Sequence, residues 1–454
     1  MAADTSSKNK RDEIEEDYDP YLHRNLTHPN QSLETLGHLI KGIIGTGILA
    51  LPEAFKLAGM ITGIISTILI GLLSTYCLRI LVRSQYILCK RKRVGLLTYP
   101  ETMEYACEVG PKFFQRCVPY AGGITNFFLV TFQVGTCCVY VVFIAVNIKF
   151  VGDQYTDPHI AYAYYVLMFF IPLLAIMMVK NLKYFAPFSH FANFVTLLTI
   201  AVCGYYVFRD LPPFSSRPAF GKFSDYFLYF GTSLFSLQSV VVVTSAENNM
   251  ENPRHFLTPF GVLNVGMFIV VSVVIYFAAT GYWKYGEDIK PSITLNFPPP
   301  DIAAQSIRIL YSLAIFITFG LQGIPAVYII QNDYIIPHLG EHATERKKKV
   351  YDYGLRITLV VLSVVLAITV PLLGLIISLV GTFCLSALGI VFPAIIELAA
   401  HWPDRLGPGK ICLWKDILII LIGIFGLCVG TYTSIYNIVQ ELIIKYSTKS
   451  ILDD

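Results

Sequence analysis

The chain has 454 residues, of which 14% are charged and 55% apolar, and its mean hydropathy is +0.59. Soluble proteins carry roughly 25% charged residues. The composition therefore excludes a soluble enzyme, a nucleic-acid-binding protein, a disordered regulator and a secreted disulfide scaffold. The net charge of +3 indicates no particular partner. The class that remains is a helical protein that crosses a lipid bilayer several times.

The first 32 residues are the most strongly charged part of the chain. They hold 11 charged residues, and six of these are acids between Asp12 and Asp19. They contain no apolar stretch of the kind found in a cleaved signal peptide. We expect residues 1–32 to form a disordered acidic tail in the cytosol.

Long apolar stretches fill the rest of the chain. A helix rises 1.5 Å per residue, so it needs about 20 apolar residues to cross a hydrocarbon layer of roughly 30 Å. Nine stretches lack Asp, Glu, Lys and Arg: Ile61–Leu78, Cys117–Ile148, Ile160–Val179, Tyr184–Phe208, Tyr226–Ala246, Phe256–Trp283, Ile309–Asn332, Ile357–Ile396 and Ile417–Gln440. The eighth can cross twice, because Pro371 and Gly374 can turn the chain near its middle. With Leu33–Leu57 as the first span, the sequence predicts an all-α membrane protein with eleven transmembrane helices.

The distribution of Lys and Arg predicts the orientation. If the N-terminus is cytosolic, the inside segments hold 20 of these residues and the outside segments hold 6. Cytosolic loops carry the excess of positive charge in membrane proteins. We therefore expect a cytosolic N-terminus, a transmembrane domain at residues 33–440, and a short tail at 441–454 that is extracellular or lumenal.

Two of the expected spans contain sequences that disfavour a continuous helix. The first span holds three glycines in six residues, each of which weakens a helix by about 1 kcal/mol relative to Ala; the stretch reads Gly42, Ile43, Ile44, Gly45, Thr46, Gly47. The sixth span holds small and polar residues between Phe230 and Ser239, including Gly231, Ser233 and Gln238. Close helix packing is the alternative explanation, because Gly, Ser and Thr are also enriched where helices touch.

The positions of the two breaks favour a transport site. The second break lies five spans after the first, and five is odd, so a second five-span unit would enter the membrane inverted relative to the first. Paired broken helices in inverted repeats form the binding sites of secondary transporters. The sequence thus predicts a 5+5 inverted repeat, at residues 33–209 and 226–400, with broken helices 1 and 6 and one extra helix at 412–440.

The first break offers complementary groups for a zwitterion. The half-helix that starts near Ile48 presents free N–H groups and a positive dipole end, which suit a carboxylate. The half-helix that ends near Lys41 and Gly42 presents free carbonyls, which suit an ammonium group. An amino acid carries both charges a few ångströms apart.

Several motifs resemble one known family. Leu36–Pro52 is similar to the first helix of the proton-assisted amino acid transporters, which belong to the amino acid/auxin permease family of the amino acid–polyamine–organocation superfamily. Further matches are Gln133–Tyr140, Tyr229–Phe235, Glu247-Asn248, Asn252–His255, Ser378–Gly381 and Phe392-Pro393. The resemblance implies the broken-helix fold of LeuT type and transport of small neutral amino acids such as glycine, alanine and proline. It also implies coupling to protons and residence in the lysosomal, vacuolar or plasma membrane, with no enzymatic activity and no cofactor.

Two positions depart from the family pattern. Leu237-Gln238-Ser239 stands where the family usually has Phe-Glu-Gly, so an acid and a glycine are missing. Thr136 stands where an aromatic residue is common, and we expect it to line the substrate pocket. Gln238 does not titrate, which predicts a neutral lining at the second break and a weaker coupling to protons.

Three ionisable residues are candidates for a functional role, and the sequence predicts no catalytic residue and no metal ligand. His38 lies one helical turn before the first break, and its ordinary pKa of about 6.5 lies between lysosomal and cytosolic pH. The resemblance implies that a histidine at this motif position couples transport to protons. We expect Glu53 and Glu247 to have gating or structural roles.

Two other functions remain open from the sequence. A membrane amino acid sensor would bind its ligand with little flux and signal through the acidic tail. An uncoupled facilitator would transport amino acids without protons. An ion or water channel is less compatible with two breaks at membrane depth.

Overall fold

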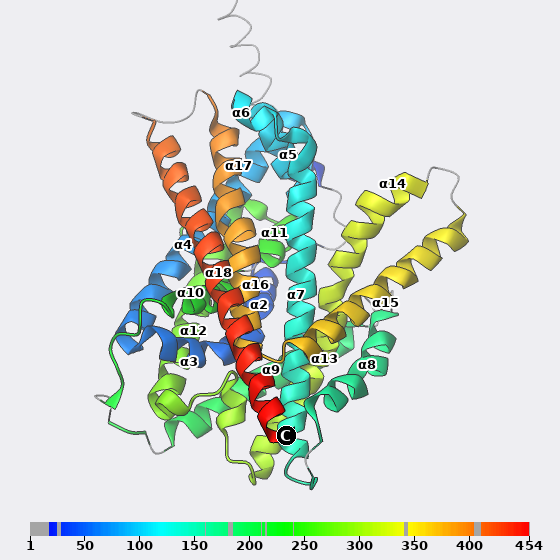
Figure 1. Ribbon diagram of the computed structural model, residues 1–454. Coiled ribbons are helices and arrows are strands. Elements are labelled where there is room, and N and C mark those ends of the chain that lie inside the picture. The colour runs from blue at the N-terminus through cyan, green and yellow to red at the C-terminus, as the bar shows by residue number, and fades with distance from the viewer. Residues whose placement is uncertain are drawn as a thin grey trace, which may run out of the picture.

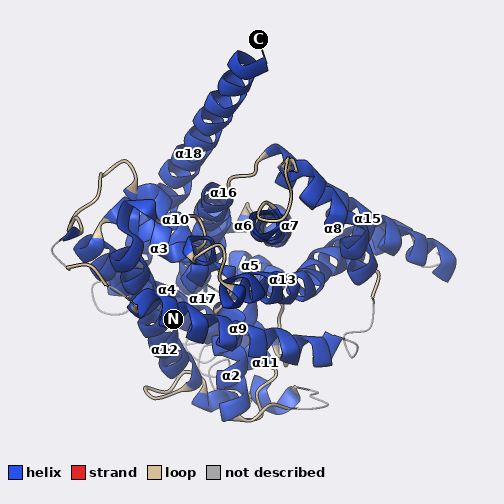
Figure 2. Ribbon diagram, turned by 90° about the horizontal axis from the view of Figure 1, so that it is seen from below, coloured by secondary structure: helices blue, strands red, loops and turns tan. Residues whose placement is uncertain are grey.

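The computed structural model describes residues 18–24, 29–158, 160–179, 185–209, 211–213, 216–238, 240–339, 344–403 and 410–453. Secondary structure in this part of the chain is helical (Figure 2), apart from one isolated bridge between Asn30 and Met250. The all-α architecture predicted from the apolar stretches is confirmed.

The helices follow one another with short connections. The first half of the chain contains η1 (Pro20–His23), α2 (Ser32–Ile43), α3 (Thr46–Ala58), α4 (Met60–Lys92), α5 (Tyr99–Val109), α6 (Lys112–Gln115), α7 (Val118–Gly152), α8 (Tyr162–Met177) and α9 (Phe185–Phe208). The second half contains α10 (Tyr226–Leu237), α11 (Val240–Asn248), η4 (Pro253–His255), α12 (Val262–Tyr285), η5 (Gly286–Asp288), η6 (Ile293–Asn296), α13 (Ile302–Ile329), η7 (Ile330–Ile335), α14 (Ile336–Leu339), α15 (Glu345–Thr369), α16 (Leu373–Val380), η8 (Gly381–Leu385), η9 (Ala387–Val391), α17 (Phe392–His401) and α18 (Ile411–Asp453).

The number of membrane crossings agrees with the sequence only in part. Nine helices in the described ranges are long and apolar enough to span a bilayer, and the bent pair α2–α3 adds a tenth. The predicted span at Ile160–Val179 corresponds to α8, which has 16 residues and is short for a complete crossing. The total of eleven therefore stays a prediction.

The stretch predicted to cross twice does turn back on itself. Helix α15 ends at Thr369, before Pro371, and α16 begins at Leu373. Proline cannot donate a backbone hydrogen bond and disfavours helical backbone in the residue before it, which explains this boundary. The helix that follows is not regular, because the π-helical segments η8 and η9 separate α16 from α17.

The two ends of the bundle carry different elements. In Figure 1, α5, α6 and the end of α17 lie at the top, and the C-terminal end of α18 lies at the bottom. We call the first of these ends the α5 face. Figure 2 shows the last turns of α18 extending away from the other helices. The predicted tail at 441–454 is thus a continuation of α18, as far as Asp453.

The expectation of a disordered tail at residues 1–32 is wrong for part of it. Residues 18–24 fold onto the α5 face, where Arg24 forms an ion pair with Glu247. Helix α2 already begins at Ser32, and Asn30 pairs with the chain after α11. The acidic residues before Tyr18 and residues 25–28 lie outside the described residues. Charge composition alone predicts solvation, but residues 18–24 have specific partners, among them Glu247 for Arg24 and Arg254 for Asp19.

Candidate functional site

The first predicted break is confirmed. Helices α2 and α3 meet at Ile44 and Gly45 with a bend of 51°. Both residues have extended backbone, so the i→i−4 ladder stops there. Gly45 occupies the N-cap of α3 and has no side chain to cap it. The N–H groups of Thr46 and Gly47 therefore have no partner within the helix.

The second break is narrower than predicted. Helix α10 continues to Leu237, so Phe230, Gly231 and Ser233 are helical, and the extended residue is Gln238. Its side-chain Nε2 donates a hydrogen bond of 2.8 Å to the carbonyl of Gly389 in η9. The amide of Gln238 thus satisfies a carbonyl in a π-helical segment of another span, and it ties the second break to that span.

The halves of the two broken helices contact each other in pairs, α3 with α10 and α2 with α11. A Cβ atom at Gly47 of α3 would lie 2.9 Å from Cα of Ser236 in α10. A Cβ atom at Gly42 of α2 would lie 2.5 Å from Cγ1 of Val242 in α11. These two glycines let the helices approach. At Gly45, by contrast, a Cβ atom would meet no heavy atom of the described residues within 4 Å, so space is open beside the break.

Two buried polar atoms beside the breaks have no hydrogen-bond partner in the described part of the chain. They are Oγ1 of Thr46 at the start of α3 and Oε1 of Gln238 at the end of α10. Such groups cost about 1–3 kcal/mol each when they stay unpaired. Both atoms can accept a hydrogen bond from a polar ligand or a water molecule.

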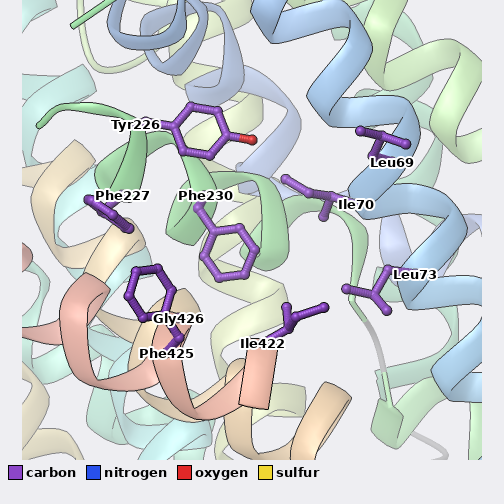
Figure 3. A pocket seen from close by; sticks show the side chains of 9 residues that line it. All are labelled: Leu69, Ile70, Leu73, Tyr226, Phe227, Phe230, Ile422, Phe425 and Gly426. Atoms are coloured by element: carbon purple, nitrogen blue, oxygen red, sulfur yellow. The ribbon is translucent and has the colours of Figure 1, made fainter. Parts of the chain in front are cut away.

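Two residues predicted to bind substrate pack against other helices. Gly231 of α10 faces Ser378 and Gly381, and its carbonyl lies where a Cβ atom of Gly381 would be. Phe230 points away from the break toward Gly426 of α18. Figure 3 shows the Phe230 ring in an apolar pocket between α4, α10 and α18, with Tyr226 and Phe227 beside it. The direction of each side chain around the axis of α10 determines which helix it contacts, and this direction cannot be read from the composition of the segment.

Two more predicted residues are buried within helices. The hydroxyl of Thr136 in α7 donates to the carbonyl of Phe132 at 2.8 Å, so it is used inside its own helix. Ser233 is buried in α10, one turn after Tyr229. Of the remaining predicted residues, Ile43 is buried and Ile44 is half-buried at the first break.

The three ionisable candidates lie in different surroundings. His38 is on an exposed side of α2. Glu53 is half-buried in α3, and its carboxylate lies against Gly374 in the first turn of α16. The cation nearest in sequence, Lys56, is engaged elsewhere, since its Nζ lies 2.7 Å from the carbonyl oxygen of Glu287. Glu247, at the end of α11, is paired with Arg24.

A cavity of ≈ 1120 Å³ opens next to the second broken helix. Polar groups from α7 and η7 line its wall, where Asn126 Nδ2 donates to Asp333 Oδ2 at 2.9 Å. The cavity reaches Gln133 of α7, one turn before Thr136, and Val241 of α11, three residues after Gln238. None of the described residues that line it comes from the first break.

Sequence reasoning missed most residues of this cavity. They come from five separate elements and include Gln85, Glu104, Asn126, Gln133, Thr244, Ser245 and Asp333. Gln133 belongs to a motif shared with the transporter family, which was the available signal. The others are single polar or charged residues on separate elements, and only the packing of α4, α5, α7, α11 and η7 brings them together.

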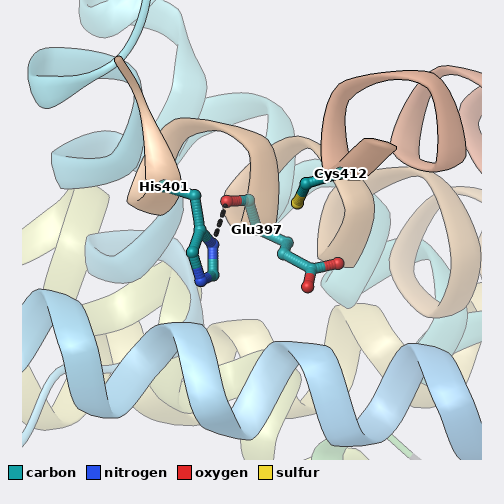
Figure 4. Close-up of side chains that lie close together, drawn as sticks. All are labelled: Glu397, His401 and Cys412. Atoms are coloured by element: carbon teal, nitrogen blue, oxygen red, sulfur yellow. Dashed lines mark hydrogen bonds between the residues drawn. The ribbon is translucent and has the colours of Figure 1, made fainter. Parts of the chain in front are cut away.

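A group of ligand-type side chains lies between α17 and α18, away from the breaks. Figure 4 shows Glu397, His401 and Cys412, whose potential ligand atoms lie within 4.8 Å of one another. Lys415 Nζ lies 2.7 Å from Glu397 Oε2 and 3.2 Å from Asp416 Oδ1. Because this ammonium group already occupies the position between the two carboxylates, we interpret the cluster as an ion-pair network that joins the two helices.

Comparisons with known proteins agree with this architecture. Residues 28–436 match the family model described as "Transmembrane amino acid transporter protein". The chain is 37% identical over 424 residues to the "Proton-coupled amino acid transporter-like protein pathetic" of Drosophila melanogaster, covering 93% of this chain and 88% of that protein. It is 25% identical to the "Probable amino acid transporter skat-1" of Caenorhabditis elegans, covering 91% and 90% of the two chains.

A solved structure has the same overall fold. The nucleobase-cation-symport-1 family transporter Mhp1, in a closed conformation with bromovinylhydantoin bound, superposes with a TM-score of 0.51. The two chains are 13% identical, and the match covers 94% of each. At this identity the likeness concerns the fold alone. The family match over nearly the whole sequence goes further: this chain belongs to the transmembrane amino acid transporter family and is a multi-pass membrane transporter, not an enzyme.

Proposed function

We propose that the protein is a secondary active transporter that moves small neutral amino acids together with protons. The observation that carries this proposal is the pairing of two broken helices in a family of amino acid transporters. Each break is a helix end, where backbone groups lack a partner inside their own helix. In the described part of the chain, each break also has a buried polar side-chain atom without a hydrogen-bond partner, Thr46 Oγ1 and Gln238 Oε1.

The first break supplies the two charges that an amino acid backbone requires. The free N–H groups of Thr46 and Gly47 lie at the positive end of α3 and bind the carboxylate. The last carbonyls of α2, near Gly42 and Ile43, lie at its negative end and bind the ammonium group. The open space beside Gly45 is where the substrate enters this arrangement.

The surroundings favour a small and uncharged side chain. Residues 42–47 and 230–238 carry no ionisable group. Lys41, the nearest cation in sequence, points away from the break and donates to Ser189 Oγ at 2.9 Å. Neither of these two segments offers a counter-ion to a charged substrate side chain, and burying an unpaired charge costs several kcal/mol. Glycine, alanine and proline fit these surroundings.

Two groups on the first broken helix can carry the coupled proton. The family resemblance favours His38, which lies on the exposed side of α2 and can exchange protons with water on its side of the membrane. The structure adds Glu53, whose carboxylate lies between the two repeats against Gly374 of α16. Protonation of Glu53 removes a charge from this contact and makes it easier for α3 and α16 to separate.

The cavity beside α11 serves as the inner vestibule of the transport path. It opens toward the α5 face, which carries the larger share of Lys and Arg and which we assign to the cytosol. On the opposite side, Gly47, Gly281 and Gly374 pack closely against neighbouring helices. This arrangement corresponds to an inward-facing state. The proposal includes eleven spans in a 5+5 inverted repeat, a lumenal or extracellular C-terminus, and a lysosomal, vacuolar or plasma membrane location.

The test is uptake by purified protein in proteoliposomes, measured for a panel of amino acids at two external pH values. We expect glycine, alanine and proline to be taken up, and faster when the external side is acidic. In His38→Ala the acid stimulation should be lost, and in Glu53→Gln it should be reduced. Uptake that is independent of pH in the parent protein would support an uncoupled facilitator. Saturable binding of the same amino acids without uptake would support a sensor.

A further inference from the structure

The short N-terminal segment Tyr18–Arg24 is held on the α5 face by its own set of contacts. We call this segment the strap. Arg24 Nη2 lies 3.1 Å from both carboxylate oxygens of Glu247, and Arg24 Nη1 donates to the carbonyl of Glu247 at 3.1 Å. The two side chains are only 6% and 3% exposed. A buried pair of this kind fixes one geometry, because either charge left alone would be poorly solvated.

A second anchor holds the other end of the strap. Asp19 forms an ion pair with Arg254 of η4, the short helix after α11, and accepts a hydrogen bond from Tyr86 of α4. The Tyr21 ring packs on Tyr86 with 4.6 Å between centroids, and Arg24 lies 4.7 Å above the Tyr21 ring. Partial burial acts to raise the pKa of Asp19, but hydrogen bonds from Arg254 and the Tyr21 amide outweigh it and hold the pKa of this carboxyl below its ordinary value.

The anchors join the inner ends of three helices of the first and second repeats. Glu247 ends α11, Tyr86 belongs to α4, and Asn30 at the start of α2 pairs with the chain after α11. The amide of Asn30 donates to the carbonyl of Asn249 at 2.8 Å, and the amide of Glu251 donates to the carbonyl of Asn30 at 2.9 Å. The inner halves of both broken helices are thus fastened to one another and to α4.

The strap also borders the proposed inner vestibule. His23 and Arg24 belong to its wall, together with Thr244 and Ser245 of α11. Any movement of α11 that closes this cavity changes the place of Glu247 relative to Gly95, whose carbonyl accepts a hydrogen bond of 3.4 Å from Arg24 Nε. Arg24 cannot keep all of these contacts when α11 moves.

We propose that the strap is a conformational latch: it is docked while the vestibule is open as in this structure, and it detaches when α11 moves to close the vestibule. The latch slows that movement and makes residues 18–24 available to the cytosol once per transport cycle. The movement of α11 rests on the proposed transport function. The docking of the strap does not, since the contacts described above establish it by themselves.

Limited trypsin digestion of the protein in lipid nanodiscs tests the latch. Trypsin requires access to Arg24, whose side chain is buried in the docked strap, and cleavage rates follow the open population when docking is fast. Cleavage after Arg11, which precedes the strap in the sequence, gives the reference rate. We expect Arg24 to be cut at least about tenfold more slowly than Arg11, and saturating alanine to change the Arg24 rate alone.

Two variants separate the latch from a general effect of charge. Glu247→Gln removes the buried partner of Arg24, and its Arg24 rate should rise about tenfold toward the reference. Glu251→Gln removes an exposed acid four residues away, and its Arg24 rate should stay as in the parent. Equal rates at Arg24 and Arg11 in the parent, or an unchanged Arg24 rate in Glu247→Gln, would overturn the docking.

Alanine uptake in proteoliposomes, measured on the same preparation, distinguishes a failed latch from a failed transport function. Uptake with no effect of alanine on the Arg24 rate would show that the strap is a fixed structural element. Absence of uptake for every amino acid tested would refute the transport function, while slow cleavage at Arg24 that Glu247→Gln accelerates would still support the docked strap.

Discussion

Replacing Gly47 by Ala tests whether the two broken helices must touch. The added Cβ atom would lie 2.7 Å from Oγ and 2.9 Å from Cα of Ser236, and 3.2 Å from Cδ1 of Phe235. The hydroxyl can rotate, but Cα is backbone. Because carbon atoms prefer separations of about 3.5–4.0 Å, α3 and α10 must move apart by roughly 0.6–1.1 Å. Overpacking of this kind costs about 1–3 kcal/mol.

The expected consequence is a large loss of transport. If the cost falls on the state with touching helices, the rate drops by about 5- to 160-fold, since about 1.36 kcal/mol corresponds to a factor of ten. The measurements are initial alanine uptake per amount of reconstituted protein and the melting temperature of the purified protein. Both should fall in Gly47→Ala.

Gly45→Ala is the matched comparison, only two residues away. No described heavy atom lies within 4 Å of its added Cβ atom, and its backbone φ of −135° suits any residue. We expect Gly45→Ala to keep the melting temperature of the parent protein. Its KM for alanine should rise, because the methyl group occupies space assigned to the substrate. Equal melting temperatures and equal uptake in the parent and Gly47→Ala would refute the close approach of the broken helices. A KM in Gly45→Ala equal to that of the parent protein would refute the placement of the substrate beside Gly45.

Three further changes have defined outcomes. Gly381→Ala should lower the melting temperature because its Cβ atom meets backbone of α10, whereas Gly354→Ala, in open space on α15, should keep or raise it by the greater helix propensity of Ala. Gln238→Glu should make uptake more strongly acid-dependent, because it adds a titratable group at the second break; superimposable pH curves for parent and variant would place residue 238 away from the coupling machinery. Asp301, the N-cap of α13, has a pKa held below 3.8 by hydrogen bonds from Tyr206 and a backbone amide. A group whose pKa is lowered by folding stabilises the fold above its unfolded-state pKa, and this stabilisation is lost as the pH falls through the folded-state pKa. The decrease in melting temperature caused by Asp301→Ala should therefore be the same at pH 7 and pH 5 and should become smaller only below pH 3.8. A decrease that is already smaller at pH 5 would contradict the role of Asp301 as a charged cap.

The sequence alone determined the class of molecule and the position of its irregularities. Membrane-spanning helices follow from composition, because water-excluded backbone must be satisfied within each segment. The bend at Ile44 and Gly45 follows from three glycines in six residues, and the turn near Pro371 follows from the missing amide of proline. These are local effects of one or a few residues, so they can be read without knowing any neighbour.

Only the tertiary structure shows which neighbour each face of a helix packs against. In α10, Gly231 packs on another span and Phe230 faces an apolar pocket between α4 and α18, although both stand in the stretch where a binding site was predicted. Rotation about a helix axis depends on the partners of the helix, and those partners lie far away in sequence. The same reason applies to Arg24, because its burial depends on Glu247, 223 residues further along the chain. A charged residue in a polar stretch of sequence is expected to be exposed, and its burial depends on a partner that is distant in sequence.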